Sequence, residues 1–477
     1  MSEKKIAVIG GGLAGCEAAL QVANRGYPIT LYEMRPKVST AAHSTDQLAE
    51  LVCSNSFGSF SDHTAPWILK RELKELNSQL LALSERCAVP AGRSLAIDRN
   101  LFAEAATEKV SSHPLIHLAR EEAKAIPEDG ITILATGPLT SESLARSLAS
   151  VLGQESLYFY DAISPIVSTD SLDFDKMFCQ SRYDKGDPDF WNIPLDREAY
   201  DRFIKQLLTG DVVLPHNFEK AKYFEGCMPI EAIAERGPQT LAFGPMKPVG
   251  LTDPKTGRRP YAVIQLRAEN RDRTAYNLVG FQTKLKYPEQ ERIFRNLPGL
   301  ENAEFLRLGS MHRNTYIDSP RHLLPTLQLR ARPSILLGGQ ITGTEGYVES
   351  IATGLIAGLN ATRLMSGQAP TFPPLETMIG ALLGTISDPQ RKDFQPTNSN
   401  MGLFPALPPL PKGKRSKPER NEALSERARL GFSNWWEKIT QETCTRLEPP
   451  LDGSQNLAVP LTIHSCPPPS HSDPSAG

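Results

Sequence analysis

Three glycines near the start of the chain have the spacing of a turn that binds phosphate. Gly10, Gly12 and Gly15 follow a short apolar segment, and Glu33 comes 18 residues after Gly15. Glycines allow a tight turn and let a pyrophosphate approach the N–H groups at the start of a helix. A carboxylate at the end of the next strand accepts hydrogen bonds from the adenosine ribose. This spacing predicts a dinucleotide site, and because Glu33 would repel a 2′-phosphate, FAD or NAD is expected rather than NADP.

Two later glycine-containing segments favour FAD over NAD. Residues 135–138 (ATGP) follow an apolar strand pattern, and residues 338–343 (GGQITG) precede a second long helix, whose N-terminus can face the flavin ring or the pyrophosphate. The residues assigned to the cofactor are Gly10, Gly11, Gly12, Leu13, Ala14, Gly15, Glu33, Gly137, Gly339, Gln340 and Gly346.

Two of the seven cysteines lie in segments that suit a reactive thiol. Cys53 is in a small polar turn (LVCSNSF), and Cys227 lies between a glycine and Met-Pro, which indicates an irregular, exposed turn. A thiolate is a soft nucleophile that nearby positive charge activates. Most cysteines are small buried hydrophobes, and Cys16 is interpreted as helix packing. The odd count and the absence of a C-x-x-C pair argue against a disulfide framework and a zinc site, and favour a reducing cytosol.

Basic and aromatic residues alternate in the middle of the chain, as they do in RNA-binding surfaces. Cations can neutralise phosphates while aromatic rings stack on bases. The alternative is an ordinary solvated surface balanced by neighbouring acids. The basic residues are Arg258, Arg259, Arg267, Arg271, Arg273, Lys284, Lys286, Arg292, Arg295, Arg313 and Arg321, and the aromatic residues are Tyr261, Tyr276, Phe281, Tyr287 and Tyr316.

The elements that must position these residues follow a βαβ rhythm at both ends of the chain. Strands are predicted at 6–9, 29–32, 132–134 and 334–337, and helices at 13–24, 66–83, 99–110 and 348–365. Between them the rhythm is lost. The sequence therefore predicts an α/β, doubly wound (Rossmann-like) FAD-binding domain of the glutathione-reductase type, interrupted by a mixed α+β insertion. The expected division is 1–181, 182–317, 318–404 and a proline-rich extension, 405–477, with one helix at 419–440 and a disordered tail.

Composition limits the classes of function. The 52 Lys and Arg residues nearly balance 54 Asp and Glu residues, so RNA binding would need a local patch rather than a generally basic surface. No apolar run approaches the ~20 residues of a membrane span. Glycines and Glu17 interrupt the apolar N-terminal stretch, which argues against a signal peptide. A cytoplasmic protein without a metal, a membrane anchor or an obligate protein partner is expected.

Several longer motifs give a more specific resemblance. The chain resembles the folate- and FAD-dependent tRNA (uracil-5-)-methyltransferases, which make 5-methyluridine in the tRNA T-loop. The resemblance implies 5,10-methylenetetrahydrofolate as carbon donor, FAD as carrier and reductant, NADPH or NADH as electron source, and an insertion that binds tRNA. The motifs are residues 9–19 (IGGGLAGCEAA), 50–57 (ELVCSNSF), 158–167 (YFYDAISPIV), 224–231 (FEGCMPIE), 241–251 (LAFGPMKPVGL), 276–283 (YNLVGFQT), 309–315 (GSMHRNT) and 339–354 (GQITGTEGYVESIATG).

The family's two functional cysteines correspond to Cys53 and Cys227. Addition of a thiolate to C6 of uridine makes C5 nucleophilic, and this attack is assigned to Cys227. Cys53 is expected to hold the one-carbon unit reversibly and to shield it from water. Ile193 stands where many relatives carry a cysteine, which argues against a catalytic role there. Candidate bases or orienting groups are Glu345, Glu349, Asp98 and His312.

Four alternatives remain at this stage. The same chemistry on ribosomal RNA would use the same motifs. A flavoprotein that modifies the wobble uridine with a GTPase partner would carry a longer helical C-terminal region than this one. A small-molecule flavin oxidoreductase would need neither the basic insertion nor the Cys227 turn. A tRNA-binding factor without catalysis would bind equally well without either cysteine.

Overall fold

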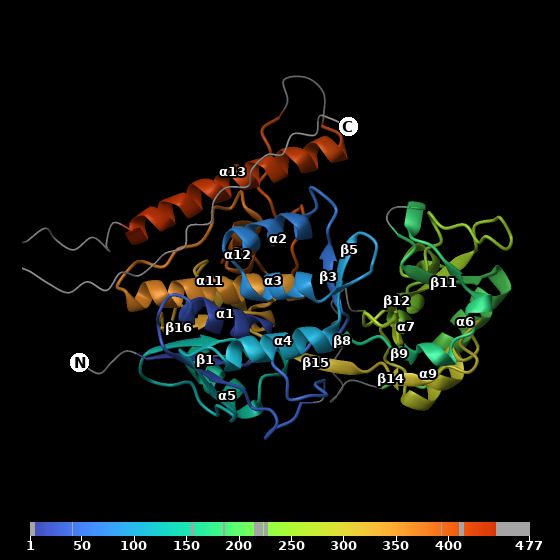
Figure 1. Cartoon of the computed structure of the whole chain (residues 1–477), viewed down its shortest axis with the longest axis horizontal. Helices are drawn as coiled ribbons and strands as arrows, with labels where there is room; N and C mark the ends of the chain where they lie inside the picture. Colours follow the sequence, from blue (N-terminus) through green and yellow to red (C-terminus); the bar gives the residue numbers. More distant parts are fainter. Residues whose placement is uncertain are drawn as a thin grey trace, which may run out of the picture.

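The chain folds into two lobes joined by a two-stranded ribbon (Figure 1). The computed structural model describes residues 5–40, 42–153, 157–184, 187–213, 223, 228–392, 394–409 and 415–444. The predicted disordered tail falls almost entirely beyond residue 444 and lies outside these residues. None of the described helices combines the length and apolar character needed to cross a membrane.

The first lobe is built on a five-stranded parallel sheet. Its order is β16-β7-β1-β2-β6, so β16, from far along the chain, lies beside β7 of the N-terminal segment. The predicted FAD-type domain that resumes after an insertion is therefore confirmed. In chain order the strands are β1 (Ile6–Ile9), β2 (Ile29–Tyr32), β6 (Ile116–Ala119), β7 (Ile131–Leu134) and β16 (Ile335–Leu337).

Helices cover both faces of this sheet, as expected for a doubly wound domain. Burial extends along every residue of α1, and almost every residue of α11. The main helices are α1 (Leu13–Ala23), α2 (Ala65–Glu75), α3 (Gln79–Arg86), α4 (Arg99–Ser111), α5 (Glu142–Leu152), α11 (Tyr347–Met365) and α12 (Met378–Ile386). A small antiparallel sheet in the order β3-β5-β4 lies beside them, with β3 (Ser56–Ser59), β4 (Ala88–Val89) and β5 (Ser94–Ile97).

The prediction of one helix over residues 66–83 was wrong, because two helices occupy this segment. Asn77 has a positive φ of 56°, which ends the helical run after α2. Ser78 then accepts a hydrogen bond from the Leu81 N–H and caps α3. The buried carboxylate of Glu17 also accepts from the N–H groups of Gln79 and Leu80. Hydrophobic periodicity runs through both helices and so did not reveal the break.

The second lobe has its own sheet and its own hydrophobic core. Six strands in the order β10-β11-β12-β13-β9-β14 pair antiparallel. This mixed α+β architecture confirms the predicted type of insertion. The strands are β9 (Ile166–Ser168), β10 (Phe178–Cys179), β11 (Phe190–Leu195), β12 (Ala262–Ala268), β13 (Ala275–Leu278) and β14 (Phe305–Arg307), and the helices are α6 (Arg197–Thr209), α7 (Ile230–Glu235), α8 (Thr240–Phe243) and α9 (Tyr287–Phe294).

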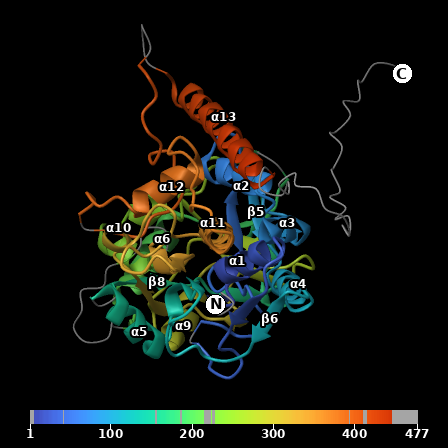
Figure 2. The same ribbon diagram turned by 90° about the vertical axis from the view of Figure 1, so that its left-hand side faces the viewer.

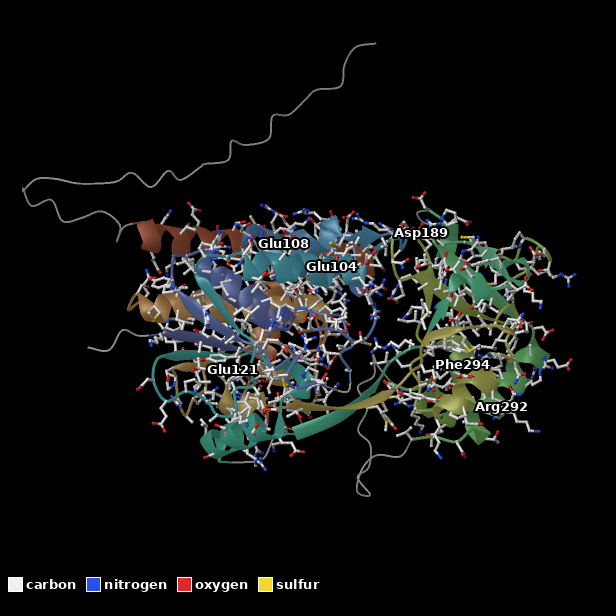
Figure 3. All side chains as sticks on the ribbon, turned by 60° about the horizontal axis from the view of Figure 1, so that its bottom comes forward. Glu104, Glu108, Glu121, Asp189, Arg292 and Phe294 are labelled. Carbon is white, nitrogen blue, oxygen red and sulfur yellow. The ribbon has the colours of Figure 1, made fainter. Side chains whose placement is uncertain are left out.

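The boundaries between the lobes follow the strands. The second sheet already includes β9 and β10, which precede residue 182, so its first strand starts earlier than the division expected from the sequence. The connecting ribbon pairs β8 (Leu157–Ala162) with β15 (Met311–Tyr316). In Figure 3 the labelled Glu104 and Glu108 mark the first lobe, and Asp189 and Phe294 mark the second. The domain division at 181/182 and 317/318 stays a proposal.

A long C-terminal helix packs on the first lobe. α13 (Lys417–Cys444) lies across α2, and its buried side chains include Leu424, Ala428 and Phe432 (Figure 2). Arg363 of α11 pairs with Glu442 at 3.0 Å. The helix predicted at 419–440 is therefore present and contacts the body of the protein.

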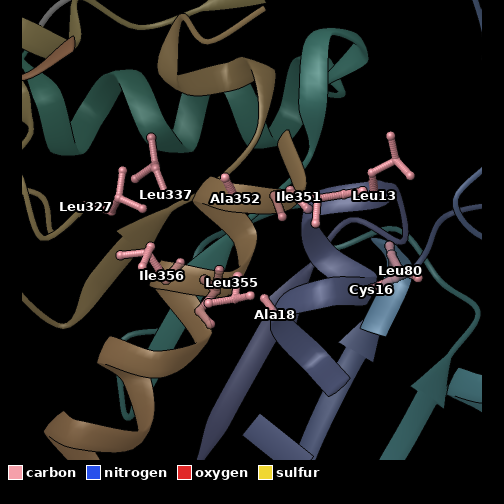
Figure 4. Packing of buried hydrophobic residues seen from close by; sticks show 14 of the residues in the cluster. Leu13, Cys16, Ala18, Leu80, Leu327, Leu337, Ile351, Ala352, Leu355 and Ile356 are labelled. Carbon is pink, nitrogen blue, oxygen red and sulfur yellow. The ribbon is translucent and has the colours of Figure 1, made fainter. Parts of the chain in front are cut away.

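The contact between α1 and α11 depends on glycine. A Cβ atom on Gly354 would lie 2.2 Å from the Ala14 carbonyl oxygen, and one on Gly358 would lie 2.8 Å from the Ala18 carbonyl oxygen. Both pairs advance by four residues, so the two helices run parallel. Figure 4 shows Leu13 and Ala18 of α1 beside Ile351 and Leu355 of α11. Larger residues on α11 would force the backbones apart.

Two Gly→Ala substitutions, one inside this contact and one outside it, should have opposite effects on the free energy of unfolding. Gly354→Ala should lower the free energy of unfolding by about 1–3 kcal/mol, because the new methyl group meets rigid backbone. Gly431→Ala in α13, where a Cβ atom would find neighbours only at 3.8 and 3.9 Å, should raise it by about 0.5–1 kcal/mol through helix propensity. Urea unfolding followed by circular dichroism measures both. Equal stability of Gly354→Ala and the unchanged protein would contradict the close approach.

Candidate functional site

The predicted phosphate-binding turn joins β1 to α1. Gly10 has a φ of 108°, and a Cβ atom there would lie 2.4 Å from the Ala135 carbonyl oxygen of the neighbouring strand end. A Cβ atom on Gly15 would lie 1.8 Å from the Gly10 carbonyl oxygen. A Cβ atom on Gly12 would meet nothing within 4 Å, and no described side chain caps α1 at this residue. The outer glycines therefore permit close packing, and Gly12 leaves the helix N-terminus open to a ligand.

Glu33 lies at the end of β2 and contacts the glycine turn directly. Its Oε2 atom accepts a hydrogen bond from the Gly11 N–H at 2.9 Å, and its Oε1 atom accepts from the Arg35 backbone N–H at 3.0 Å and from Nε at 2.9 Å. Burial would raise the pKa of Glu33, but the hydrogen bonds and charge of Arg35 and the Gly11 N–H outweigh it, so the pKa lies below its usual value. Glu33 is therefore held as a carboxylate.

A cavity lies against this turn, with about 1000 Å³ of empty space that includes open solvent at its mouth. Nearly all of the residues assigned to the cofactor line it; Gly15 is packed beneath the turn, and Gly346 lines the next cavity. The lining also includes four residues that were not predicted from the sequence, namely Arg35, Thr40, His43 and Glu50. Arg35, Thr40 and His43 belong to none of the motifs above, and Glu50 begins the 50–57 motif but was not assigned to the cofactor. Arg35 forms buried pairs with Glu33 and Glu50. The assigned residues in the lining are Gly10, Gly11, Gly12, Leu13, Ala14, Glu33, Gly137, Gly339 and Gln340.

Cys53 lines a second cavity, with about 720 Å³ of empty space that includes open solvent. Ser54, Ser56, Asn314 and Glu345 also line it. The two cavities share six lining residues, so a molecule in the first lies next to the thiol in the second. The shared residues are Val52, Pro138, Leu139, Gln340, Tyr347 and Ser350.

The loop that carries Cys53 is held by hydrogen bonds from α4 and α11. The Cys53 N–H donates to Tyr347 Oη at 2.9 Å, and the Cys53 carbonyl oxygen accepts from Arg99 Nη2 at 3.3 Å. Burial raises the pKa of Tyr347 above its usual value, and the neighbouring Cys53 acts in the same direction, so Tyr347 is a neutral phenol. Cys227 lies outside the described residues, and its relation to Cys53 stays a prediction.

Of the four candidate bases, Glu345 lines the cavity that contains Cys53. The Glu345 side chain is buried, and its Oε1 atom accepts a hydrogen bond from Gln340 Nε2. Glu349 is buried elsewhere and accepts from Ser399, and burial raises its pKa. Asp98 caps the N-terminus of α4. The side chain of His312 lies outside the described part of the structure.

The basic segment of the insertion lobe differs from the expected RNA platform. Arg267 is buried, and Lys286 and Arg292 pair with acids; Arg321, which follows the connecting ribbon and lies outside this lobe, pairs with Asp318. Three of the five aromatic residues, Tyr276, Phe281 and Tyr316, are buried in the cores and cannot stack on bases. Tyr276 lies in β13, where all four residues are buried, and Phe281 follows that strand, so packing against other elements covers these rings, which a count of residue types does not show. Ile193, by contrast, is fully buried in β11, consistent with packing.

Among the aromatic residues that the structure describes in the insertion lobe, the most exposed is Phe243, which was not included in the basic and aromatic segment predicted from the sequence. Phe243, at the end of α8, is 76% exposed. Its neighbours hold it rigidly, because Leu241 and Met246 are fully buried and Thr240 Oγ1 donates to the carbonyl oxygens of Ile233 and Gly237. The ring is therefore attached to a packed element and left open to solvent.

The fold and the two cavities define the class of protein. A parallel sheet, a glycine turn at the start of α1 and a carboxylate after β2 are the parts of an FAD-binding flavoprotein domain. A family model described as Glucose inhibited division protein A matches residues 5–369. The structure of GidA from Aquifex aeolicus has a TM-score of 0.66 at 17% identity, covering 93% of this chain and 77% of that one, and so shares the fold.

Curated relatives identify the family within this class. Methylenetetrahydrofolate--tRNA-(uracil-5-)-methyltransferase TrmFO from Pelobacter propionicus is 54% identical over 446 residues, covering 93% of this chain and 97% of the relative. The protein of the same name from Geotalea daltonii is 55% identical over 436 residues, covering 91% and 99%. The chain belongs to the methylenetetrahydrofolate--tRNA-(uracil-5-)-methyltransferase TrmFO family, which confirms the resemblance seen in its motifs.

The Glu33 contacts predict a pH-dependent stability difference. Because its folded-state pKa lies below 4.5, ionised Glu33 stabilises the fold above about pH 4.5, and this contribution is lost as pH falls through the folded pKa. Glu33→Gln should lower the free energy of unfolding of the FAD-free protein by about 1.5–3 kcal/mol at pH 7, with a smaller difference at pH 4. Glu104→Gln, which changes an exposed side chain of α4, is the control. A difference that grows on acidification would contradict the assignment.

Proposed function

We propose that this chain methylates C5 of a uridine in the tRNA T-loop, with the carbon from 5,10-methylenetetrahydrofolate, FAD as carrier and reductant, and NADPH or NADH as electron source. The observation that carries the proposal is that the cavity of Cys53 adjoins the nucleotide cavity through six shared residues. The identity of 54% and 55% with relatives named for this activity supports the same assignment. The reaction belongs in the cytosol, where tRNA and folate are available.

The residues of the first cavity fit FAD. The uncapped N-terminus of α1 at Gly12 would bind the pyrophosphate through its N–H groups and its positive dipole. Glu33 would face the adenosine ribose, although both of its oxygens already accept hydrogen bonds from the protein. Gly137, Gly339 and Gln340 line the same space. When bound, FAD supplies a one-carbon carrier and a hydride.

The protein's own groups have three tasks in this proposal. The Cys227 thiolate would add to C6 of uridine, so that the ring π electrons form an enolate and C5 attacks the one-carbon unit. Cys53 would hold and shield that unit in the second cavity. Glu345, which lines this cavity, would accept the C5 proton, and the electron pair of that C–H bond would form an exocyclic methylene as the bond from the carbon to its carrier breaks. Addition of hydride would convert the methylene to methyl, and the resulting enolate would expel the Cys227 thiolate. Without a buried site the activated carbon would be lost to water.

The insertion lobe would bind the tRNA around Phe243. Residues 236–252 contain Arg236 and Lys247 and no acid, and Phe243 lines a surface hollow with residues 237–240. An exposed ring beside cations suits an unstacked base and its phosphate. The uridine must leave the folded T-loop, which costs a few kcal/mol that such contacts would offset.

The choice of carbon donor tests the proposed reaction. The FAD-loaded protein should transfer label from labelled methylenetetrahydrofolate to 5-methyluridine in unmodified tRNA when NADPH is present, and should transfer none from labelled S-adenosylmethionine. Nucleoside digestion and mass spectrometry measure the product. If label entered ribosomal RNA and not tRNA, ribosomal RNA would be the substrate in place of tRNA. Label in a wobble uridine would favour the flavoproteins that modify that position with a GTPase partner.

Cysteine variants provide the controls for that assay. Cys227→Ala and Cys53→Ala should each keep the flavin absorbance of the loaded protein and lose methylation. Cys179→Ala changes an exposed cysteine in the other lobe and should methylate normally. Turnover at the unchanged rate by either of the first two variants would remove its cysteine from the mechanism.

Removal of the exposed ring should weaken tRNA binding specifically. Phe243→Ala should raise the Kd for unmodified tRNA by about tenfold, because stacking on one base contributes about 1–3 kcal/mol, and flavin absorbance should not change. Leu430→Ala, which removes an exposed apolar side chain of α13, is the control. Filter binding at two salt concentrations measures both. An unchanged Kd would place the RNA on another surface.

A further inference from the structure

The Cys53 loop is held from both lobes by two arginines. Arg99, at the start of α4 in the first lobe, donates from Nη1 to the Leu51 carbonyl oxygen at 2.9 Å and from Nη2 to the Cys53 carbonyl oxygen at 3.3 Å. Arg307, at the end of β14 in the insertion lobe, donates from Nη2 to the Val52 carbonyl oxygen at 2.9 Å. Three consecutive carbonyl groups are thus held by two guanidinium groups on different lobes.

The two arginines are themselves anchored. Arg99 Nε donates to Glu269 Oε2 at 2.7 Å, and Glu269 follows β12 of the insertion lobe, so the Arg99 side chain is fixed from across the boundary. Arg307 also reaches the Ala42 carbonyl oxygen at 3.4 Å. Asn55 adds a further bond between the lobes, from its Nδ2 atom to the Ala268 carbonyl oxygen at 3.1 Å. The loop conformation therefore depends on how the insertion lobe sits against the first lobe.

The charge around the thiol is strongly positive. Arg99, Arg267 and Arg307 all interact electrostatically with Cys53, and Glu269 is the acid among them. Arg267 is 6% exposed, and its Nε atom has no hydrogen-bond partner among the described residues. The neutral phenol of Tyr347 completes the surroundings from α11. Glu345 lines the same cavity, so three cations face two carboxylates around the thiol, and the excess of positive charge favours a thiolate at this position.

We propose that Arg99 and Arg307 are positioning residues for the proposed reaction. They hold the carbonyl groups of Leu51, Val52 and Cys53 so that the Cys53 thiol faces the second cavity, and their positive charges stabilise that thiol as a thiolate. The proposal rests on the proposed function for its chemistry. Because Arg307 and Glu269 belong to the insertion lobe, the lobe assigned to tRNA, a change in the position of that lobe would alter the contacts that hold the Cys53 loop.

A purely structural role between the lobes is the competing explanation, and Arg271 separates the two. Arg271 also crosses the boundary, donating to the carbonyl oxygens of Arg86 and Ala88, and its N–H donates to Asp98. None of these hydrogen bonds reaches the Cys53 loop. If the arginines only join the lobes, loss of Arg271 should affect the thiol as much as loss of Arg307.

The test is the pH profile of Cys53 alkylation in the full-length protein. Iodoacetamide would be the probe, with the modified Cys53 peptide quantified by mass spectrometry from pH 5 to 10, with and without FAD. Arg307→Gln and Arg99→Gln should move the midpoint of the profile upward by about one pH unit, because each removes a positive charge near the thiolate. Arg271→Gln should leave the midpoint unchanged.

Lysine variants separate charge from positioning. Arg307→Lys keeps the charge, but the lysine side chain ends one atom short of Nη2, the atom that donates to the carbonyl oxygens of both Ala42 and Val52. It should keep the alkylation midpoint and lower kcat for methylation at least tenfold, with KM for tRNA changed less than threefold. Thermal unfolding of every variant controls for general destabilisation.

The outcomes are distinct. A midpoint that does not move in Arg307→Gln, or that moves equally in Arg271→Gln, overturns the proposal, as does full activity of Arg307→Lys. If the unchanged protein transfers no label from folate while the midpoint still moves as expected, the proposed function fails and the electrostatic role of the two arginines stands.

Discussion

The close parallel contact of α1 with α11 is the constraint on which the site depends. Glycine at 354 and 358 lets the α11 backbone approach the carbonyl groups of α1, and the parallel direction brings the starts of both helices to the same side. Neither helix has a described side chain capping its N-terminus. Two positive dipole ends therefore face the cavities, and Tyr347, the first residue of α11, is brought against the Cys53 loop.

The same contact explains how one site is assembled from distant segments. β16 and α11 follow the insertion, yet they complete the sheet and the lining that began with β1 and α1. Residues from the turn after β1, from the loop at Cys53 and from the start of α11 share the walls of two adjoining cavities. The insertion between β7 and β16 therefore lies at the edge of the site, and the two strands still pair in the first sheet.

The insertion lobe contributes to the site more through buried groups than through its surface. Its surface cations are largely paired with acids, whereas Arg267, Glu269 and Arg307 lie at the boundary with the first lobe. Removing charge from water is costly unless the groups are paired or bind an anion. An excess of buried arginine beside a thiol is therefore better explained by chemistry at that thiol than by stability.

The sequence alone determined the local features, because they depend on short spacings. The glycine turn, the β1-α1-β2 unit, Glu33 and the return of the chain to the first sheet follow from residue types and hydrophobic periods, and the longer motifs determined the family and singled out Cys53. The tertiary structure decided which groups meet. Arg35 with Glu50, Arg99 and Arg307 at the Cys53 loop, and the exposed ring of Phe243 have no common spacing in the chain. The inward orientation of Tyr276 and Phe281 likewise came from long-range packing, because burial depends on what covers a residue and periodicity reports only its own segment.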